Sequence, residues 1–166
     1  VRYHTEVAPP RLAAADSILA GELPTWWEGS GLGVPLLGEP SHGAAYPGVW
    51  IAATPLALDL TWIVHLWWLA LGIVLWARRL GASDLAAMLA SVLVAARGIL
   101  ASSALRGALP ALAHVPWLAW AATILAQHAQ IERGLRVPDG EQAPGISPAL
   151  AAIVVALALS AIGLAG

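Results

Sequence analysis

Cysteine is absent from this chain of 166 residues, and charged residues are scarce at 11%. The lack of cysteine excludes disulfides, iron–sulfur clusters, thiolate zinc sites and thiol nucleophiles. A typical globular domain has roughly 25% charged residues, so this chain has too few charges to cover a surface that faces water. Its net charge of −2 offers no basic face to phosphates. Nucleic acid is therefore not expected as a partner.

Apolar residues are abundant instead, at 59% of the chain with a mean hydropathy of +0.75. They form long unbroken runs, and a helix needs about 20 such residues to cross a bilayer. The sequence therefore predicts an all-α fold, a polytopic transmembrane helical bundle with about four spans and membrane lipid around it. The expected spans are 56–77, 84–103, 108–127 and 149–166.

Residues 1–50 form the one large polar region and divide the chain into two parts, 1–50 and 51–166. Apolar residues between Arg11 and Leu23 recur at helical spacing, and Gly21 and Pro24 end that pattern. The glycine- and proline-rich stretch 24–47 predicts a loop, whose Trp and Tyr residues suit a membrane interface. A loosely ordered connector is the alternative interpretation. Because the chain starts at Val1 and stops within an apolar run, we expect a piece of a longer protein, or a processed one.

Arginine positions predict the orientation of the helices. Arg78 and Arg79 lie in one short turn, and Arg133 and Arg136 follow after an even number of further crossings. Positive residues in short loops favour the cytoplasmic side. Residues 1–50 are then extracytoplasmic, and the protein is expected in a bacterial inner (plasma) membrane as a multi-pass protein.

Three ionisable residues, Asp59, His65 and Arg97, lie within the apolar runs, where a charge costs at least about 2.5 kcal/mol and usually faces the bundle interior. Asp59 is close enough to the helix end to reach the interface. His65 favours a structural role over a ligand role. Arg97 requires an acidic partner, a water-filled cavity or a bound anion such as a lipid phosphate.

The polar residues of 1–50 show no spacing typical of a metal site, since His4-x-Glu6 is too short a signal. No metal ligands or other cofactors are predicted, although nothing in the sequence forbids a divalent ion. Gly31-x-Gly33 lacks a preceding strand, which argues against a dinucleotide site. Ser102 and Ser103 lack the glycine context of an intramembrane serine protease.

Several short motifs follow one another along the first three quarters of the chain. The first is AGELPTW at 20–26, and the second runs from Gly33 through Pro35-Leu36-Leu37, Glu39-Pro40 and Gly43 to Tyr46-Pro47. His65-Leu66, Leu71-Gly72 and Arg78-Arg79-Leu80-Gly81 follow. In order and spacing these motifs resemble the YfhO family of bacterial membrane proteins, whose GELPLWNP is similar to the first of them. The resemblance covers roughly residues 3–125.

The resemblance implies a GT-C-type glycosyltransferase, with many transmembrane helices and a large first outer loop. Such hexosyltransferases move a sugar from a polyprenyl-phosphate donor to a cell-envelope acceptor on the outer face. A non-catalytic integral membrane protein, either a transporter segment or a scaffold subunit, is the alternative. A transporter would show internal repeats or broken helices in corresponding positions.

The family's catalytic carboxylate corresponds to a position near Val1 and Arg2, neither of which is acidic. Glu6, oriented by His4, is therefore the candidate acid–base residue, and the alternative is a solvated Glu6 with the true base upstream. Arg11 and Arg106 are candidates for binding the lipid phosphate through bidentate contacts. The remaining predicted substrate-binding residues are Trp26, Trp27, Glu39 and His42.

Overall fold

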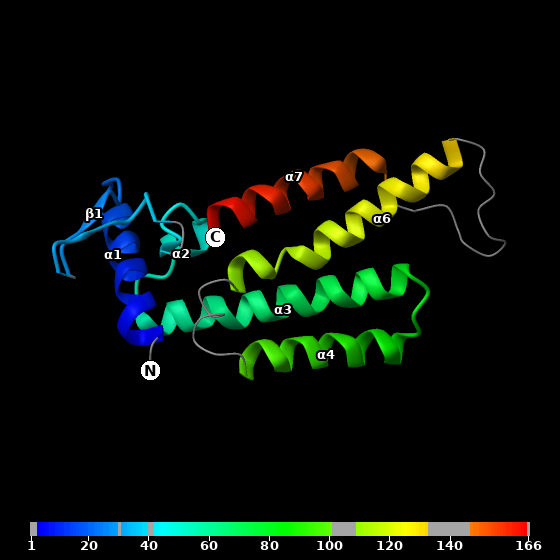
Figure 1. Ribbon diagram of the computed structural model, residues 1–166, viewed down its shortest axis with the longest axis horizontal. Coiled ribbons are helices and arrows are strands. Elements are labelled where there is room, and N and C mark those ends of the chain that lie inside the picture. Colours follow the sequence, from blue (N-terminus) through cyan, green and yellow to red (C-terminus); the bar gives the residue numbers. More distant parts are fainter. Residues whose placement is uncertain (1–2, 30, 40–41, 101–108, 133–146, 166) are drawn as a thin grey trace.

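The computed structural model describes residues 3–29, 31–39, 42–100, 109–132 and 147–165. The protein is mostly helical, as the sequence predicts. Long helices lie side by side, and a smaller unit formed by the first 50 residues lies at one end of them (Figure 1). Helices α3 and α6 both begin at this end of the molecule. We call it the capped end and the other the open end.

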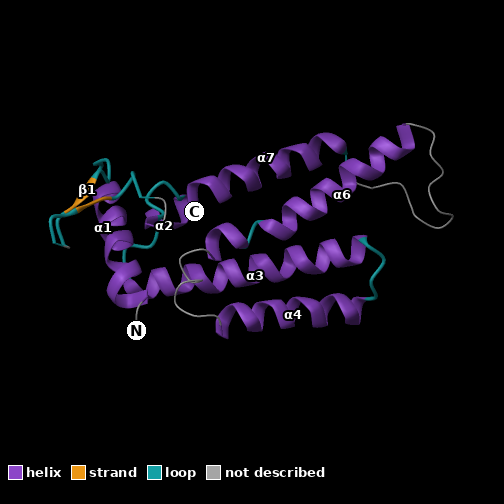
Figure 2. Cartoon of the chain, viewed as in Figure 1, coloured by secondary structure: helices purple, strands orange, loops and turns teal. Residues whose placement is uncertain are grey.

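The N-terminal unit is built from short elements around α1, Ala8–Leu19, which follows a π-helical turn at Tyr3–Val7. Gly21 ends α1 with φ +77°, a left-handed conformation that glycine adopts without steric cost. An antiparallel hairpin of β1, Trp26–Trp27, and β2, Val34–Pro35, follows (Figure 2). The sequence predicts only a loop here, because strands of two residues are too short to show the alternation of apolar and polar residues that indicates a strand. Helix α2, Pro47–Trp50, completes the unit.

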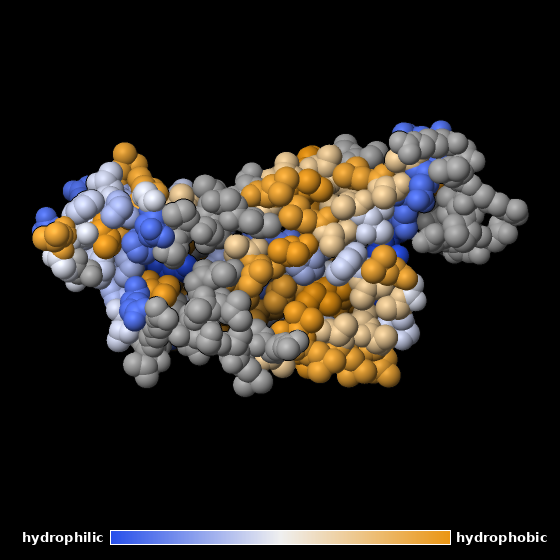
Figure 3. Space-filling view, in the orientation of Figure 1, coloured by the Kyte–Doolittle hydropathy of each residue, from blue (hydrophilic) through white to orange (hydrophobic). Residues whose placement is uncertain are grey.

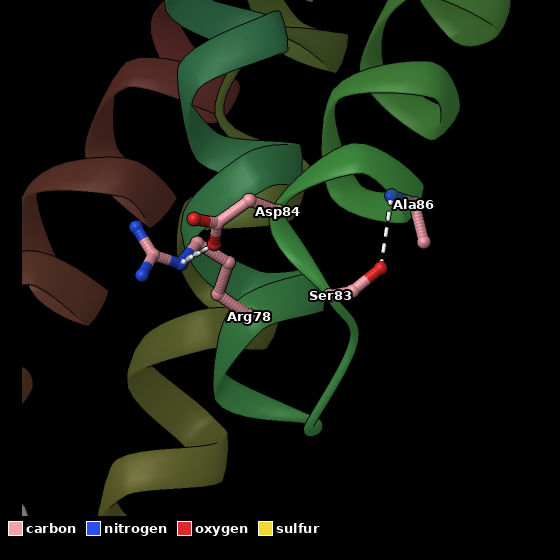
Figure 4. Close-up of polar contacts among 4 residues, drawn as sticks. All are labelled: Arg78, Ser83, Asp84 and Ala86. Carbon is pink, nitrogen blue, oxygen red and sulfur yellow. Dashed lines mark hydrogen bonds and ion pairs between the residues drawn. The ribbon is translucent and has the colours of Figure 1, made fainter.

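Helices α3, Pro55–Arg79, and α4, Asp84–Leu100, form an antiparallel pair. The Thr54 hydroxyl accepts a hydrogen bond from the Ala57 N–H (3.1 Å) and caps the start of α3. Ser83 caps α4 in the same way through the Ala86 N–H, and Arg78 pairs with Asp84 across the turn at 2.9 Å (Figure 4). Both partners of that ion pair are largely exposed, so it contributes about 0–1 kcal/mol. The cap at Ser83 confirms the start predicted for this helix.

Helix α6, Val115–Glu132, is preceded by a helical turn at 109–112 and a break at 113–114. The sequence predicts one span from about residue 108, but Pro116 has no N–H for the Leu112 carbonyl and its ring crowds that group. The helix is therefore interrupted and restarts with Pro116 in its first turn. Helix α7, Pro148–Ala165, packs against α6 through Ala121, Ile124 and Ala151.

Two helical stretches are long and apolar enough to cross a membrane, Pro55–Arg79 and Leu109–Glu132. Apolar residues on α3 remain exposed along one continuous stripe, namely Leu60, Ile63, Val64, Trp67 and Leu71. An apolar band covers the middle of the molecule between more polar ends (Figure 3). Such a surface is typical of a protein that faces lipid.

The N-terminal unit is attached to the helices by an apolar cluster. Ala8 and Ala52 pack with Leu58 in the first turn of α3, and all three are buried. A second cluster inside the unit joins α1 to Leu36, Ala44 and Val49. These contacts hold the unit over the capped end of the helices, where the polar residues described next converge.

Candidate functional site

Three aromatic side chains from different parts of the chain meet at the capped end, and we call them the Tyr46–His65–His114 cluster. Tyr46 lies in the N-terminal unit just before α2, His65 lies on α3, and His114 lies at the break before α6. Their ring centroids are 5.4 Å (Tyr46–His65), 6.4 Å (Tyr46–His114) and 6.4 Å (His65–His114) apart. The cluster therefore joins the N-terminal unit to both candidate spans.

Hydrogen bonds fix how the imidazoles are protonated. His65 Nδ1 lies 2.5 Å from the Thr61 carbonyl oxygen, and His114 Nδ1 lies 2.7 Å from the Pro110 carbonyl oxygen. A carbonyl oxygen can only accept, so each Nδ1 carries the proton and each Nε2 of a neutral ring is an acceptor. The Tyr46 hydroxyl donates to His65 Nε2 at 2.6 Å. His65 is thus bonded through both nitrogens, which agrees with the structural role expected for it.

Arg11 contributes a buried positive charge close to the cluster. Its side chain is 2% exposed and lies against Gly43. A Cβ atom placed on Gly43 would be only 3.5 Å from Arg11 Nη2, which shows how close the two residues are. Its charge is near enough to act electrostatically on His65. Because so little of its surface is exposed, Arg11 can act on a charge near the cluster only through its field, and not through direct contact with a lipid phosphate.

An aromatic stack borders the cluster between α3 and α6. Trp68 and Trp117 stack with centroids 4.0 Å apart, and the Trp117 indole N–H donates to the Trp68 carbonyl oxygen at 3.0 Å. The Trp68 ring lies 6.4 Å from the His114 ring and remains 41% exposed. An apolar ring face beside a few fixed polar atoms is typical of a small-molecule site.

The other predicted site residues are spread over the N-terminal unit. Glu6 is exposed on the first turn of the chain, and Trp26 and Glu39 are exposed, whereas Trp27 and His42 are half-buried. Asp59 is exposed near the start of α3, where the sequence places it at the interface. None of these six residues belongs to the cluster. The side chains of His4 and Arg97, and all of Arg106, lie outside the described residues.

His114 is the residue that sequence reasoning missed. The signal that could have found it is its position between Pro110 and Pro116, since two prolines so close predict an interruption in an apolar helix. Polar side chains at such interruptions are exposed to protein or water rather than to lipid. In the described part of the chain, no three His, Asp or Glu side chains converge as metal ligands.

Comparison with known proteins adds no identification to this geometry. No family model, curated protein or solved structure matches the chain. The resemblance to the YfhO family therefore remains a hypothesis from the motifs, and the function is argued below from the site.

Replacing Tyr46 by phenylalanine is expected to destabilise the protein by about 1–3 kcal/mol, because His65 Nε2 would be buried without a donor. Burial also raises the pKa of Tyr46. Above pH 10 the unfolded chain loses the phenolic proton of Tyr46, whereas the folded protein keeps it. The stability that this group contributes is therefore fully present below pH 10 and is lost as the pH rises from 10 through the pKa of Tyr46 in the folded protein. Thermal unfolding in detergent across pH 8–11 measures both effects.

The control for this prediction is Tyr3→Phe, which removes the other of the two tyrosines. The alkaline loss of stability should persist in Tyr3→Phe and disappear in Tyr46→Phe. Equal curves for the wild type and Tyr46→Phe at every pH would show that the Tyr46–His65 bond contributes nothing.

Proposed function

We propose that the chain is a GT-C-type glycosyltransferase of the bacterial inner membrane. It transfers a hexose from a polyprenyl-phosphate donor to a cell-envelope acceptor on the outer face. The membrane part rests on the two candidate spans and on the exposed apolar stripe of α3. In this proposal α4 and α7 cross the membrane as well, which makes four spans.

The observation that carries the proposal is the position of the Tyr46–His65–His114 cluster. It lies where the N-terminal unit meets both candidate spans, about three helical turns into α3 and at the break in Leu109–Glu132, with the buried Arg11 nearby. A donor whose lipid tail lies in the membrane presents its phosphate and sugar to the region where the spans meet the N-terminal unit. A positive field in a poorly hydrated site stabilises the charge that develops on a departing phosphate.

The reaction makes modest demands on the protein. An acceptor hydroxyl attacks the anomeric carbon, the bond from that carbon to the phosphate oxygen breaks, and a base removes the hydroxyl proton. Trp26 and Trp68 are exposed enough to offer apolar faces to a sugar or lipid. Glu6 stays a candidate for the base, since it precedes Val7, which packs over the first turn of α3.

One observation favours a transporter segment as a second candidate. The break at 113–114 interrupts a candidate span, and interrupted helices form the substrate sites of many transporters. Transporter folds repeat such a break in a second, equivalent helix. The helices α3 and α4 are continuous over their described lengths, which leaves the transferase as the better-supported function.

Sugar transfer in proteoliposomes tests the proposal. The complete protein is supplied with undecaprenyl phosphate that carries labelled glucose, mannose or galactose, together with a cell-envelope fraction. We expect label from one donor to move into an envelope polymer or lipid, and empty liposomes serve as the control. Label that stays on all three donors contradicts the transferase function.

A further inference from the structure

We infer that His114 is the catalytic base of this site, and that its Nε2 accepts the proton of the acceptor hydroxyl. The inference deepens the proposed transferase function and rests on it. It assigns the proton acceptor to an imidazole at a helix break, where the motif resemblance points to a carboxylate in the N-terminal unit.

The first argument is the bonding of the two imidazoles. Both hold their Nδ1 proton on a backbone carbonyl, which leaves Nε2 as the basic atom. His65 Nε2 is occupied by the Tyr46 hydroxyl. Within the described part of the chain, His114 Nε2 makes no hydrogen bond. His114 is therefore the imidazole of the pair whose basic nitrogen is open to a substrate.

The second argument is that His114 is already oriented as a base must be. The bond from Nδ1–H to the Pro110 carbonyl fixes the tautomer, and it also stabilises the imidazolium that forms when Nε2 takes a proton. A hydrogen-bond acceptor at Nδ1 has this role in the Ser-His-Asp triad. Here a carbonyl left without its helical partner near a proline break supplies the acceptor.

The third argument is location. His114 is half-buried at the start of a candidate span, beside the exposed Trp68 ring and in the same cluster as Tyr46. The exposed Glu6 belongs to the first turn of the chain and is not part of that cluster. A base has to be within about 2.6–3.2 Å of the proton it removes. The ring of His114, at the membrane end of the site, can meet an acceptor that attacks a lipid-linked sugar.

The proton and electron changes balance with the groups named. The acceptor oxygen forms a bond to the anomeric carbon while the bond from that carbon to the phosphate oxygen breaks. Polyprenyl phosphate leaves with the electron pair, and the hydroxyl proton passes to His114 Nε2. The imidazolium later returns the proton to water, so no oxidant, reductant or further reactant is required.

The test measures transfer by the complete protein and its variants in proteoliposomes, with the three labelled undecaprenyl-phosphate sugars described above. His114→Gln should lower kcat by about 100-fold or more, the usual contribution of a general base, with KM for the donor unchanged. His128→Gln is the matched control, because His128 lies on α6, roughly 21 Å along the helix axis from His114 at 1.5 Å per residue. It should transfer at the wild-type rate.

Rescue by imidazole separates catalysis from folding. His114→Ala leaves space for a small base, so added imidazole should restore part of its transfer, and it should not restore His114→Gln. Wild-type transfer by His114→Gln, or loss in His114→Ala that imidazole does not relieve, overturns this inference and leaves the transferase function standing. A wild-type protein that transfers none of the three sugars contradicts the proposed function itself, and the inference fails with it.

Discussion

Replacing Gly72 by alanine is expected to destabilise the contact between α3 and α6 by roughly 2–4 kcal/mol. A Cβ at this position would lie 2.7 Å from Trp117 Nε1 and 3.1 Å from Pro116 Cβ. Trp117 cannot turn away freely, because it stacks on Trp68 and donates its indole N–H to the Trp68 carbonyl.

The magnitudes decide the sign of this effect. Loss of the hydrogen bond costs about 1 kcal/mol, loss of the stack costs about 1 kcal/mol, and overpacking costs about 1–3 kcal/mol. The gain in helix propensity from glycine to alanine is only about 1 kcal/mol. For a chain of this size the net loss lowers Tm by roughly 5–15 °C, measurable by thermal unfolding in detergent.

A double-mutant cycle identifies the cause of that loss. In a Trp117→Leu background the clash is relieved, so Gly72→Ala should cost at least about 1 kcal/mol less than in the wild type. Leu71→Ala is the control, because Leu71 is 47% exposed on the apolar stripe of α3. An unchanged Tm in Gly72→Ala would show that α3 and α6 do not meet at this glycine.

Helix positions follow well from the sequence because each has a local cause. The Ser83-Asp84 pair is a start signal whose cap forms as predicted, and Thr54 before Pro55 is an equivalent signal that caps α3. Gly21 ends α1 as expected. The interruption before α6 was missed because prolines are tolerated in a first helical turn. Two prolines six residues apart cannot both occupy that turn, so the helix has to restart.

The site was harder to predict because its partners are distant in the sequence. A buried His65 that needs one or two hydrogen bonds follows from its apolar surroundings, and one of its bonds is local, to Thr61. The second comes from Tyr46, 19 residues away in a loop. The sequence suggests Tyr46 only as an interfacial aromatic residue. No periodicity links a loop residue to a helix face, so such contacts require the three-dimensional structure.

The orientation of the helices in the membrane rests on the two ends of α3. The N-terminal unit packs against the start of α3, and Arg78 and Arg79 form the last helical turn at its other end, just before the short connection 80–83. Arg79 also donates a hydrogen bond to the Gln127 side chain, so α6 reaches the same open end. Asp84 pairs with Arg78. Its negative charge does not cancel the effect of the two arginines on membrane orientation, because acidic residues contribute little to that orientation.

Labelling of single cysteines in intact cells should therefore divide the chain into two sides. The chain has no cysteine, so Leu32→Cys, Leu80→Cys and Gln130→Cys each introduce one thiol at an exposed position. We expect an impermeant maleimide to label position 32 in intact cells, and positions 80 and 130 only after the membrane is permeabilised. Labelling of 80 and 130 but not 32 would reverse the orientation and place the Tyr46–His65–His114 cluster at the cytoplasmic face. Labelling of 80 and 130 from opposite sides would show that α3 and α6 do not both cross the bilayer, because the hydrogen bond between Arg79 and Gln127 requires those helix ends to lie on one side.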